Sequence, residues 1–175
     1  IGGKIDKGSN FDWAFKKYNS ECIIDTNWNF TIDNGSTNEI LKKIKIDSQN
    51  NVYVIGYPLY NFSSSAWVIK KFNLNGNEIT SGWNKTISGE YSFAYSIDTD
   101  NNDNVYVIGD FESYSTIKKY SPSGVEDTVN WNKNYSNTNE IWNHVRDIVI
   151  RDNSLYVVGD IRSNIATEYD WWIKK

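Results

Sequence analysis

The sequence has very few of the side chains that most often build metal sites, disulfides and catalytic centres. Its 175 residues include one cysteine, Cys22, one histidine, His144, and no methionine. A single cysteine cannot close an internal disulfide, and a single histidine cannot build a histidine-based metal site. We therefore interpret both as structural or solvent-facing residues.

Long apolar runs and clusters of positive charge are also missing. No apolar run approaches the ~18 residues that a membrane helix needs. Acidic residues outnumber basic residues by 22 to 18, for a formal net charge of −4, whereas a nucleic-acid interface needs clustered Lys and Arg. We expect neither a membrane span nor a nucleic-acid partner.

Aromatic residues, by contrast, are abundant, because they make up 15% of the chain and include eight Trp and twelve Tyr. A disordered chain carries few aromatic residues, and a chain of this length can bury a sizeable core. We therefore expect one folded domain.

One short segment occurs three times. It reads Asn-Val-Tyr-Val-Ile-Gly-Tyr at 51–57, Asn-Val-Tyr-Val-Ile-Gly-Asp at 104–110 and Ser-Leu-Tyr-Val-Val-Gly-Asp at 154–160. Branched and aromatic residues occupy both faces of its pleat, which predicts a strand buried on both sides and closed by a glycine.

Three other segments recur around it in a fixed order. An inner strand precedes it at 43–47, 94–98 and 147–151, a strand with a Lys-Lys pair follows it at 13–18, 67–72, 115–120 and 171–175, and a Trp-Asn strand comes last at 28–32, 83–87 and 131–135. The turn at 98–104 is predicted to be longer than its counterpart at 47–51. No helical period is present over any long window, so the sequence predicts an all-β fold.

Four antiparallel strands repeated about every ~50 residues are typical of a β-propeller, whose blades bury both faces of their inner strands. The main alternative is a β-sandwich, which predicts alternating apolar and polar residues along most strands. The Val-Tyr-Val strands contradict that alternation. We therefore predict β-propeller blades of four antiparallel strands, in about three repeat units.

The segment from Ile97 through 104–110 and 117–124 to Trp131 resembles the bacterial seven-bladed β-propeller repeat family. That family's unit has a strand ending in Asp, a Val-Tyr-Val-Thr-Gly strand, a strand ending near Asp-Pro-Ser-Gly, and a Trp strand. The sequence departs from it where the family usually carries Thr, at Ile55, Ile108 and Val158. The resemblance implies a secreted or surface protein of bacteria and no catalytic motif.

The repeat predicts a single propeller segment with a partial blade at each end. The predicted units are a partial blade at 1–33, blades at 40–88 and 93–136, and a partial blade at 145–175. We interpret Ile1, Gly2 and Gly3 as the last residues of a strand whose Val-Tyr-Val part is missing. Because closed propellers have ~4 to 8 blades, we expect further blades of the same protein, or other copies of this chain, to complete the ring.

One polar loop carries oxygen ligands of the kind that calcium prefers. Asp98, Asp100 and Asp103 have spacings similar to those of calcium loops, and Ca²⁺ takes about six to eight oxygen ligands. The loop lacks the central glycine and the distal glutamate of an EF-hand. Two interpretations stay open, a weak calcium site and a lengthened polar hairpin without an ion, and we expect no other cofactor.

Aromatic residues suggest a second kind of site, because an exposed ring can stack on a sugar. Tryptophans that recur at one repeat position are better interpreted as packing between blades. Trp142 and Trp172 lie outside the recurring series. Together with Tyr57, Tyr60 and Tyr114 from the variable loops, they are the candidate ligand-binding residues.

Motifs of catalysis are sparse, since the sequence has no Gly-x-Ser-x-Gly turn and no phosphate loop. Asp110 and Glu112 could act as acid and base in a glycosidase-like propeller, which is the third hypothesis. The first is a non-catalytic extracellular or envelope-associated scaffold and interaction module, at the cell surface or in the periplasm, with a protein or glycan partner. The second is a carbohydrate-binding propeller that uses surface aromatics.

Overall fold

The computed structural model shows an all-β chain. It describes residues 1–8, 10–33, 38–59, 64–112, 114–131, 133–135, 140–152, 154–163 and 170–175, and the side chains of 64, 133, 135, 140–143, 161–163, 170–172 and 174 lie outside the description. These ranges contain no helix, and so none with the length and apolar character that a membrane crossing requires.

The described strands are numbered along the chain. In chain order they are β1 (Gly2–Asp6), β2 (Phe11–Tyr18), β3 (Ile24–Ile32), β4 (Asn38–Ile46), β5 (Val52–Leu59), β6 (Ser64–Phe72), β7 (Lys85–Glu90), β8 (Phe93–Thr99), β9 (Val105–Phe111), β10 (Tyr114–Tyr120), β11 (Lys133–Tyr135), β12 (Glu140–Arg151), β13 (Ser154–Ser163) and β14 (Asp170–Lys174).

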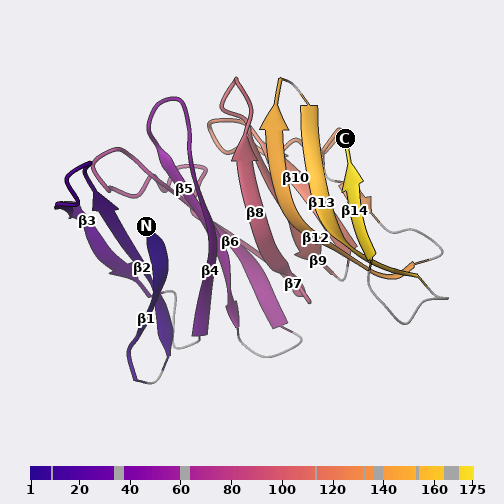
Figure 1. Ribbon diagram of the computed structural model, residues 1–175, viewed down its shortest axis with the longest axis horizontal. Coiled ribbons are helices and arrows are strands. Elements are labelled where there is room, and N and C mark those ends of the chain that lie inside the picture. Colours follow the sequence, from indigo (N-terminus) through magenta and orange to yellow (C-terminus); the bar gives the residue numbers. More distant parts are fainter. Residues whose placement is uncertain are drawn as a thin grey trace.

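The strands form four small antiparallel sheets, and none of the sheets in the described part is closed. The first sheet holds β1 to β3, the second β4 to β7, the third β8 to β11 and the fourth β12 to β14, with hydrogen-bonded neighbours in chain order. The four sheets succeed one another along the longest dimension of the molecule (Figure 1).

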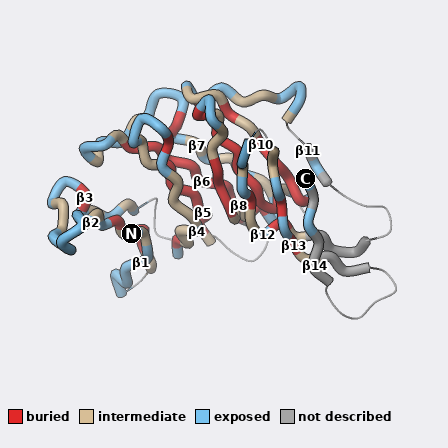
Figure 2. Tube along the Cα trace, turned by 45° about the horizontal axis from the view of Figure 1, so that its top comes forward, coloured by how far each residue is buried: buried red, intermediate tan, exposed pale blue. Residues whose placement is uncertain are grey.

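Hydrophobic side chains fill the space between successive sheets. The largest cluster joins Tyr53 and Trp67 of the second sheet, together with Trp83 just before β7, to Ile97 and Val105 of the third sheet. Similar clusters lie on either side, one between the first and second sheets and one between the third and fourth. Buried residues accordingly gather along the central strands, while the far end of the first sheet is mostly exposed (Figure 2).

The prediction that the Val-Tyr-Val strands are buried on both faces is confirmed for the two middle sheets. In β5, Tyr53 and Ile55 face the third sheet whereas Val54 faces the first, and β9 is buried from Val105 to Asp110. The equivalent strand β13 differs, because Val157 is buried while Tyr156 and Val158 are exposed. Each strand also continues past its glycine, to Leu59 in β5 and to Phe111 in β9.

The turn at 98–104 is not longer than its counterpart, so that prediction was wrong. Ile46 pairs with Val52, as Thr99 pairs with Val105. The Asp100 side chain accepts hydrogen bonds from Asn102 and Asn104 N–H groups at 2.9 Å, in the way that Asp47 accepts from Gln49 and Asn51. Asp100 is therefore the repeat equivalent of Asp47, and the sequence alignment was displaced by two residues.

The prediction that each Trp-Asn segment is a strand from its tryptophan onwards holds only for the first copy. Trp28 lies inside β3, but Trp83 and Trp131 precede β7 and β11. Trp83 belongs to a turn. Its backbone N–H donates to the Thr80 carbonyl at 3.3 Å, and the preceding Gly82 has φ of 74°. A residue held in this turn can direct its indole sideways into the next sheet.

Candidate functional site: a polar row on the inner strands

A β-bulge recurs on the first strand of the second, third and fourth sheets, opposite the glycine of the Val-Tyr-Val strand. Gly56, Gly109 and Gly159 pair with Leu41, Ala94 and Val145, and the register then shifts by one residue in each sheet. A Cβ atom on Gly109 would lie 2.1 Å from the Phe93 carbonyl oxygen. Glycine is therefore needed where the bulged backbone approaches its neighbour so closely.

The extra residue in each bulge is a large polar or aromatic one, and we call Lys42, Tyr95 and Arg146 the bulge row. Lys42 Nζ lies 5.6 Å from the centre of the Tyr95 ring, and the Arg146 guanidinium lies 5.6 Å from the same ring. Lys42 Nζ is also 5.5 Å from the Tyr57 ring. The bulges thus bring two cations to one phenol ring at cation–π distance.

Beneath the bulge row lies the carboxylate of Asp110, which is only 5% exposed. Its Oδ2 accepts a hydrogen bond from the Tyr95 hydroxyl at 2.9 Å and lies 2.6 Å from His144 Nδ1. Its Oδ1 is buried and has no hydrogen-bond partner among the described residues. Burial, followed by the Asp110 charge, raises the pKa of Tyr95, so the phenol keeps its proton and its O–H donates a hydrogen bond to Asp110.

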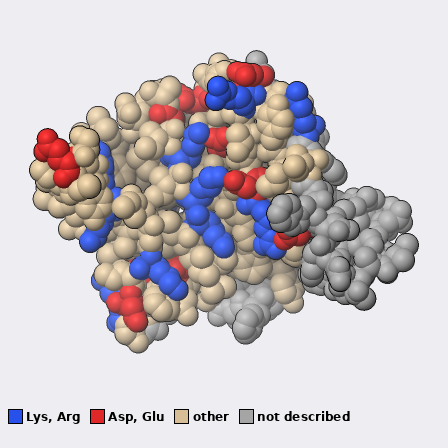
Figure 3. All heavy atoms as spheres, viewed as in Figure 1, with Lys and Arg blue, Asp and Glu red and all other residues tan. Residues whose placement is uncertain are grey.

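The row continues as ion pairs, one within the fourth sheet and one that joins the second sheet to the fourth. Arg146 Nε lies 2.6 Å from Asp160 Oδ2. One position further along the inner strands, Lys43 of β4 contacts Asp147 of β12, and Ser96 of β8 donates to Asp147 at 2.6 Å. On the face drawn in Figure 3, basic side chains with acidic ones beside them gather over the middle of the molecule. This polar row can offer both donors and acceptors to a polar ligand or partner.

Of the predicted ligand-binding residues, Tyr57 joins this cluster, but as a buried side chain. It is 8% exposed and packs edge-on against Phe93, with ring centres 5.0 Å apart. Tyr114 lies at the start of β10 and is 45% exposed. Tyr60 lies outside the described residues, as do the side chains of Trp142 and Trp172, whose backbones belong to β12 and β14.

The three carboxylates of the predicted calcium loop have different partners. Asp98 lies 2.5 Å from Lys45 Nζ and accepts from the Ile150 N–H at 2.6 Å, whereas Asp100 closes its own turn. Asp103 accepts from the Ser48 N–H at 2.9 Å and from the Ser48 hydroxyl at 2.6 Å, and these bonds lower the pKa of Asp103. In the described ranges no three His, Cys, Asp or Glu side chains are grouped so as to hold a metal.

Three of the recurring tryptophans connect successive sheets by hydrogen bonds, whereas the buried indole N–H of Trp13 has no partner among the described residues. The indole N–H of Trp28 donates to the Leu74 carbonyl at 2.8 Å. Trp67 donates to the Asp110 carbonyl at 2.7 Å, and Trp83 to the Pro122 carbonyl at 2.9 Å. All three are at most 4% exposed, so each ring packs between sheets while its polar edge is satisfied by the next sheet.

Sequence reasoning did not anticipate the contact between His144 and Asp110, which lie in different sheets. The contact depends on the bulges, and a bulge has no strong sequence signal other than the repeated glycine. Asp110 and Glu112 are the predicted catalytic pair, but Glu112 is exposed in the β9–β10 turn at φ of 50°.

A comparison with family models and with curated proteins finds no match for this chain.

Proposed function

We propose that the protein is a non-catalytic, propeller-type scaffold and interaction module of the extracellular space or cell envelope. The observation that carries the proposal is the set of three buried indoles, those of Trp28, Trp67 and Trp83, each hydrogen-bonded to the following sheet. Side chains used in this way hold sheets in fixed relation and are not free to stack on a ligand. The succession of small antiparallel sheets with both faces packed also supports blades of a propeller.

The bulge row supplies the interaction surface in this proposal. Lys42 is exposed and the side chain of Arg146 is 49% exposed, whereas Asp110 below them is buried. Rows of fixed charges set the register and orientation of a partner more than they add affinity. We therefore place the partner contact over the inner strands β4, β8 and β12.

The scaffold is tested by cooperative unfolding. Urea denaturation followed by tryptophan fluorescence and by circular dichroism should give coincident transitions, because interlocked sheets unfold together. Trp67→Phe should lower the midpoint of both signals equally, and Tyr114→Phe on the exposed side of β10 serves as the matched control. Two separated transitions would contradict a single interlocked unit.

The interaction surface is tested with a photo-crosslinking amino acid placed at Lys42 and, as a control, at the exposed Val129. The Lys42 position should crosslink an envelope component, and excess unlabelled protein should compete while the Arg146→Glu variant should not. Equal crosslinking from Val129 would overturn the assignment.

The two alternatives have their own readouts. Saturable binding of an oligosaccharide that Tyr114→Ala abolishes would favour the carbohydrate-binding hypothesis. Hydrolysis of 4-nitrophenyl glycosides that Asp110→Asn abolishes would overturn the non-catalytic assignment.

A further inference from the structure

A cavity of about 420 Å³ lies where the first turns of the second, third and fourth sheets meet. These turns follow β4, β8 and β12, the inner strands that also carry the bulge row. The cavity is lined by Lys45 and Ser48 from the second sheet, by Thr99 and Asp103 from the third, and by Arg151 from the fourth. Its volume lies in the range of ~300 to 1,000 Å³ that is typical of small-molecule sites.

Two buried aspartates of the third sheet hold the walls of this cavity in place. Asp98 lies 2.5 Å from Lys45 Nζ and accepts a hydrogen bond from the Ile150 N–H at 2.6 Å, so it joins the third sheet to both of its neighbours. Each carboxylate oxygen of Asp103 accepts one hydrogen bond from Ser48 and retains a second acceptor position. The cavity is therefore preformed, and a buried acceptor lines it.

The turn of the fourth sheet is one residue shorter than the turns of the other two. Residues 151–154 connect the paired Ile150 and Leu155, whereas residues 47–51 and 100–104 connect the equivalent pairs of the second and third sheets. A shorter turn fills less space beside the turn of the third sheet. The cavity thus follows from a difference between the repeats.

The first residue of the turn differs between the repeats as well. In the second and third sheets it is Asp47 and Asp100, whose carboxylates accept hydrogen bonds from their own turns. In the fourth sheet it is Arg151, whose side chain is 82% exposed and whose Nε lies 3.8 Å from Asp152 Oδ2. That distance is longer than a hydrogen bond, so the guanidinium can donate to a ligand in the cavity.

The remaining lining combines two apolar side chains with two polar ones. Ile46 and Ile150 line the cavity, and Thr99, which stands at the equivalent position of the third sheet, adds a hydroxyl group. Asn101 stands at the repeat position of Ser48 and also lines the cavity. Within the described ranges neither Thr99 nor Asn101 makes a side-chain hydrogen bond. Both polar groups are therefore available to a ligand.

Charges of both signs line the cavity in nearly equal number. The cations are Lys45 and Arg151, and the carboxylates are those of Asp100, Asp103 and Asp152. This near balance disfavours a highly charged ligand of either sign, and the described residues include no group of acidic, His or Cys side chains placed to hold a metal. A neutral ligand with several hydroxyl groups suits such a lining, because each hydroxyl can both donate and accept.

We propose that this cavity binds one sugar ring of a glycan. The C–H face of the ring packs on Ile46 and Ile150, and its hydroxyl groups bond to Thr99, Asp103 and Arg151. The site uses no residue of the bulge row and none of the candidate aromatic residues. It goes beyond the proposed scaffold function and does not depend on it.

The test titrates the whole chain with the methyl glycosides of glucose, galactose, mannose and N-acetylglucosamine, one at a time, and follows the amide signals by two-dimensional NMR. At least one glycoside should give saturable shifts at the amides of Thr99, Asn101 and Arg151. The expected dissociation constant is in the millimolar range, because a single ring buries little area. Absence of saturable shifts with all four glycosides would overturn the proposal.

A matched pair of threonine variants localises the site. Thr99→Val removes one hydroxyl group, and the isoleucines at the equivalent positions of the neighbouring sheets show that a branched apolar side chain fits there. It should weaken glycoside binding about fivefold, the worth of one neutral hydrogen bond. Thr86→Val, at an exposed position of β7, should leave binding unchanged. Equal effects of the two substitutions would contradict the assignment.

Two further substitutions separate the cavity from other sites. Arg151→Leu should weaken glycoside binding about tenfold, since it removes a charged donor, whereas Tyr114→Ala should have no effect. Loss of binding in Tyr114→Ala with full binding in Arg151→Leu would place the sugar at the aromatic loops and overturn the proposal. Inorganic phosphate or Ca²⁺ that shifts the same amides at lower concentration than any glycoside would overturn it as well, because the cavity would then be an ion site.

Discussion

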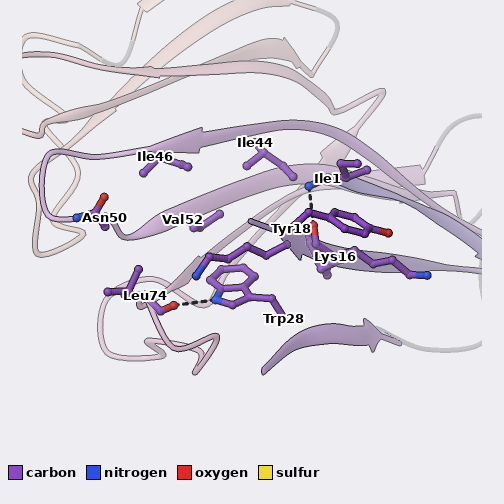
Figure 4. Close-up of a pocket in the computed structure, with 11 residues that line it drawn as sticks. Ile1, Lys16, Tyr18, Trp28, Ile44, Ile46, Asn50, Val52 and Leu74 are labelled. Carbon is purple, nitrogen blue, oxygen red and sulfur yellow. Dashed lines mark hydrogen bonds between the residues drawn. The ribbon is translucent and has the colours of Figure 1, made fainter. Parts of the chain in front are cut away.

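The interface between the second and third sheets and the interface between the first and second sheets use the same repeat positions, yet they are filled to different extents. At the middle interface Tyr53, Trp83 and Lys71 form a complete stack against fully buried Ile97. At the first interface no described residue holds the equivalent place beside Trp28, and a cavity of about 430 Å³ lies there (Figure 4). The same repeat positions thus give a fully buried wall at Ile97 and a half-buried wall at Ile44.

The largest expected effect comes from the glycine opposite the bulge. Gly109→Ala would place Cβ 2.1 Å from the Phe93 carbonyl oxygen, whereas Gly3, which pairs with Ala14 in the first sheet, has no atom within 4 Å of that position. We expect Gly109→Ala to lower the free energy of unfolding by about 3 kcal/mol or more, as overpacked cores do.

The control for this prediction is Gly3→Ala, which should leave urea denaturation nearly unchanged. Among the residues that the structure describes, no bulged inner strand lies against the glycine of the first sheet, so the contrast isolates the bulge. Equal destabilisation by both substitutions would show that strand propensity, and not close approach, governs these positions.

A smaller contrast is expected between two tryptophans. Trp83→Leu removes a ring that packs against Tyr53 and Tyr120, and should cost about 2–4 kcal/mol of stability, by analogy with other large-to-small core changes. Trp28→Leu should cost about 1 kcal/mol less, because part of its ring already borders the cavity. Thermal unfolding of both variants measures the difference, and a larger loss from Trp28→Leu would show that the cavity does not weaken the packing of Trp28.

The smallest expected effect concerns pH. Hydrogen bonds from Ser48 lower the pKa of Asp103 below its ordinary value of 3.8, so Asp103 contributes stability that is present above about pH 4 and is lost as the pH falls through the lowered pKa. Asp103→Asn should reduce stability by about 1 kcal/mol at pH 7 and by less at pH 3.

The matched control is Asp25→Asn, which removes the surface ion pair with Lys17 in the first sheet. The Lys17 hydrogen bond lowers the pKa of Asp25 as well, but the exposed pair is screened by solvent. We expect no measurable change in stability at either pH, and a dependence on pH as large as that of Asp103 would contradict the importance of burial.

Much of the strand order could be predicted from the sequence, because branched and aromatic residues at 51–57 and 104–110 define buried strands without reference to distant residues. The all-β class and the packing role of Trp67 and Trp83 follow from the same repeats. Periodicity reports which residues share a face, and repetition reports which positions share a role.

The polar site could not be predicted in the same way. Lys42, Tyr95 and Arg146 meet only because each is the extra residue of a bulge, and a one-residue change of register is not visible in a pattern of period two. The contact of His144 with Asp110 likewise depends on how two sheets are placed. The error in aligning Asp98 with Asp47 has the same origin, since polar turns carry little information about register.

The inner strands show one more consequence of this arrangement. Lys43, Ser96 and Asp147 stand at equivalent positions of three successive sheets and contact one another. Three identical copies of the second sheet would bring like ammonium groups together there, and three copies of the fourth would do the same with carboxylates. The divergence between the repeats therefore helps to prevent misassembly, since each sheet is chemically matched to the neighbours that the chain order provides.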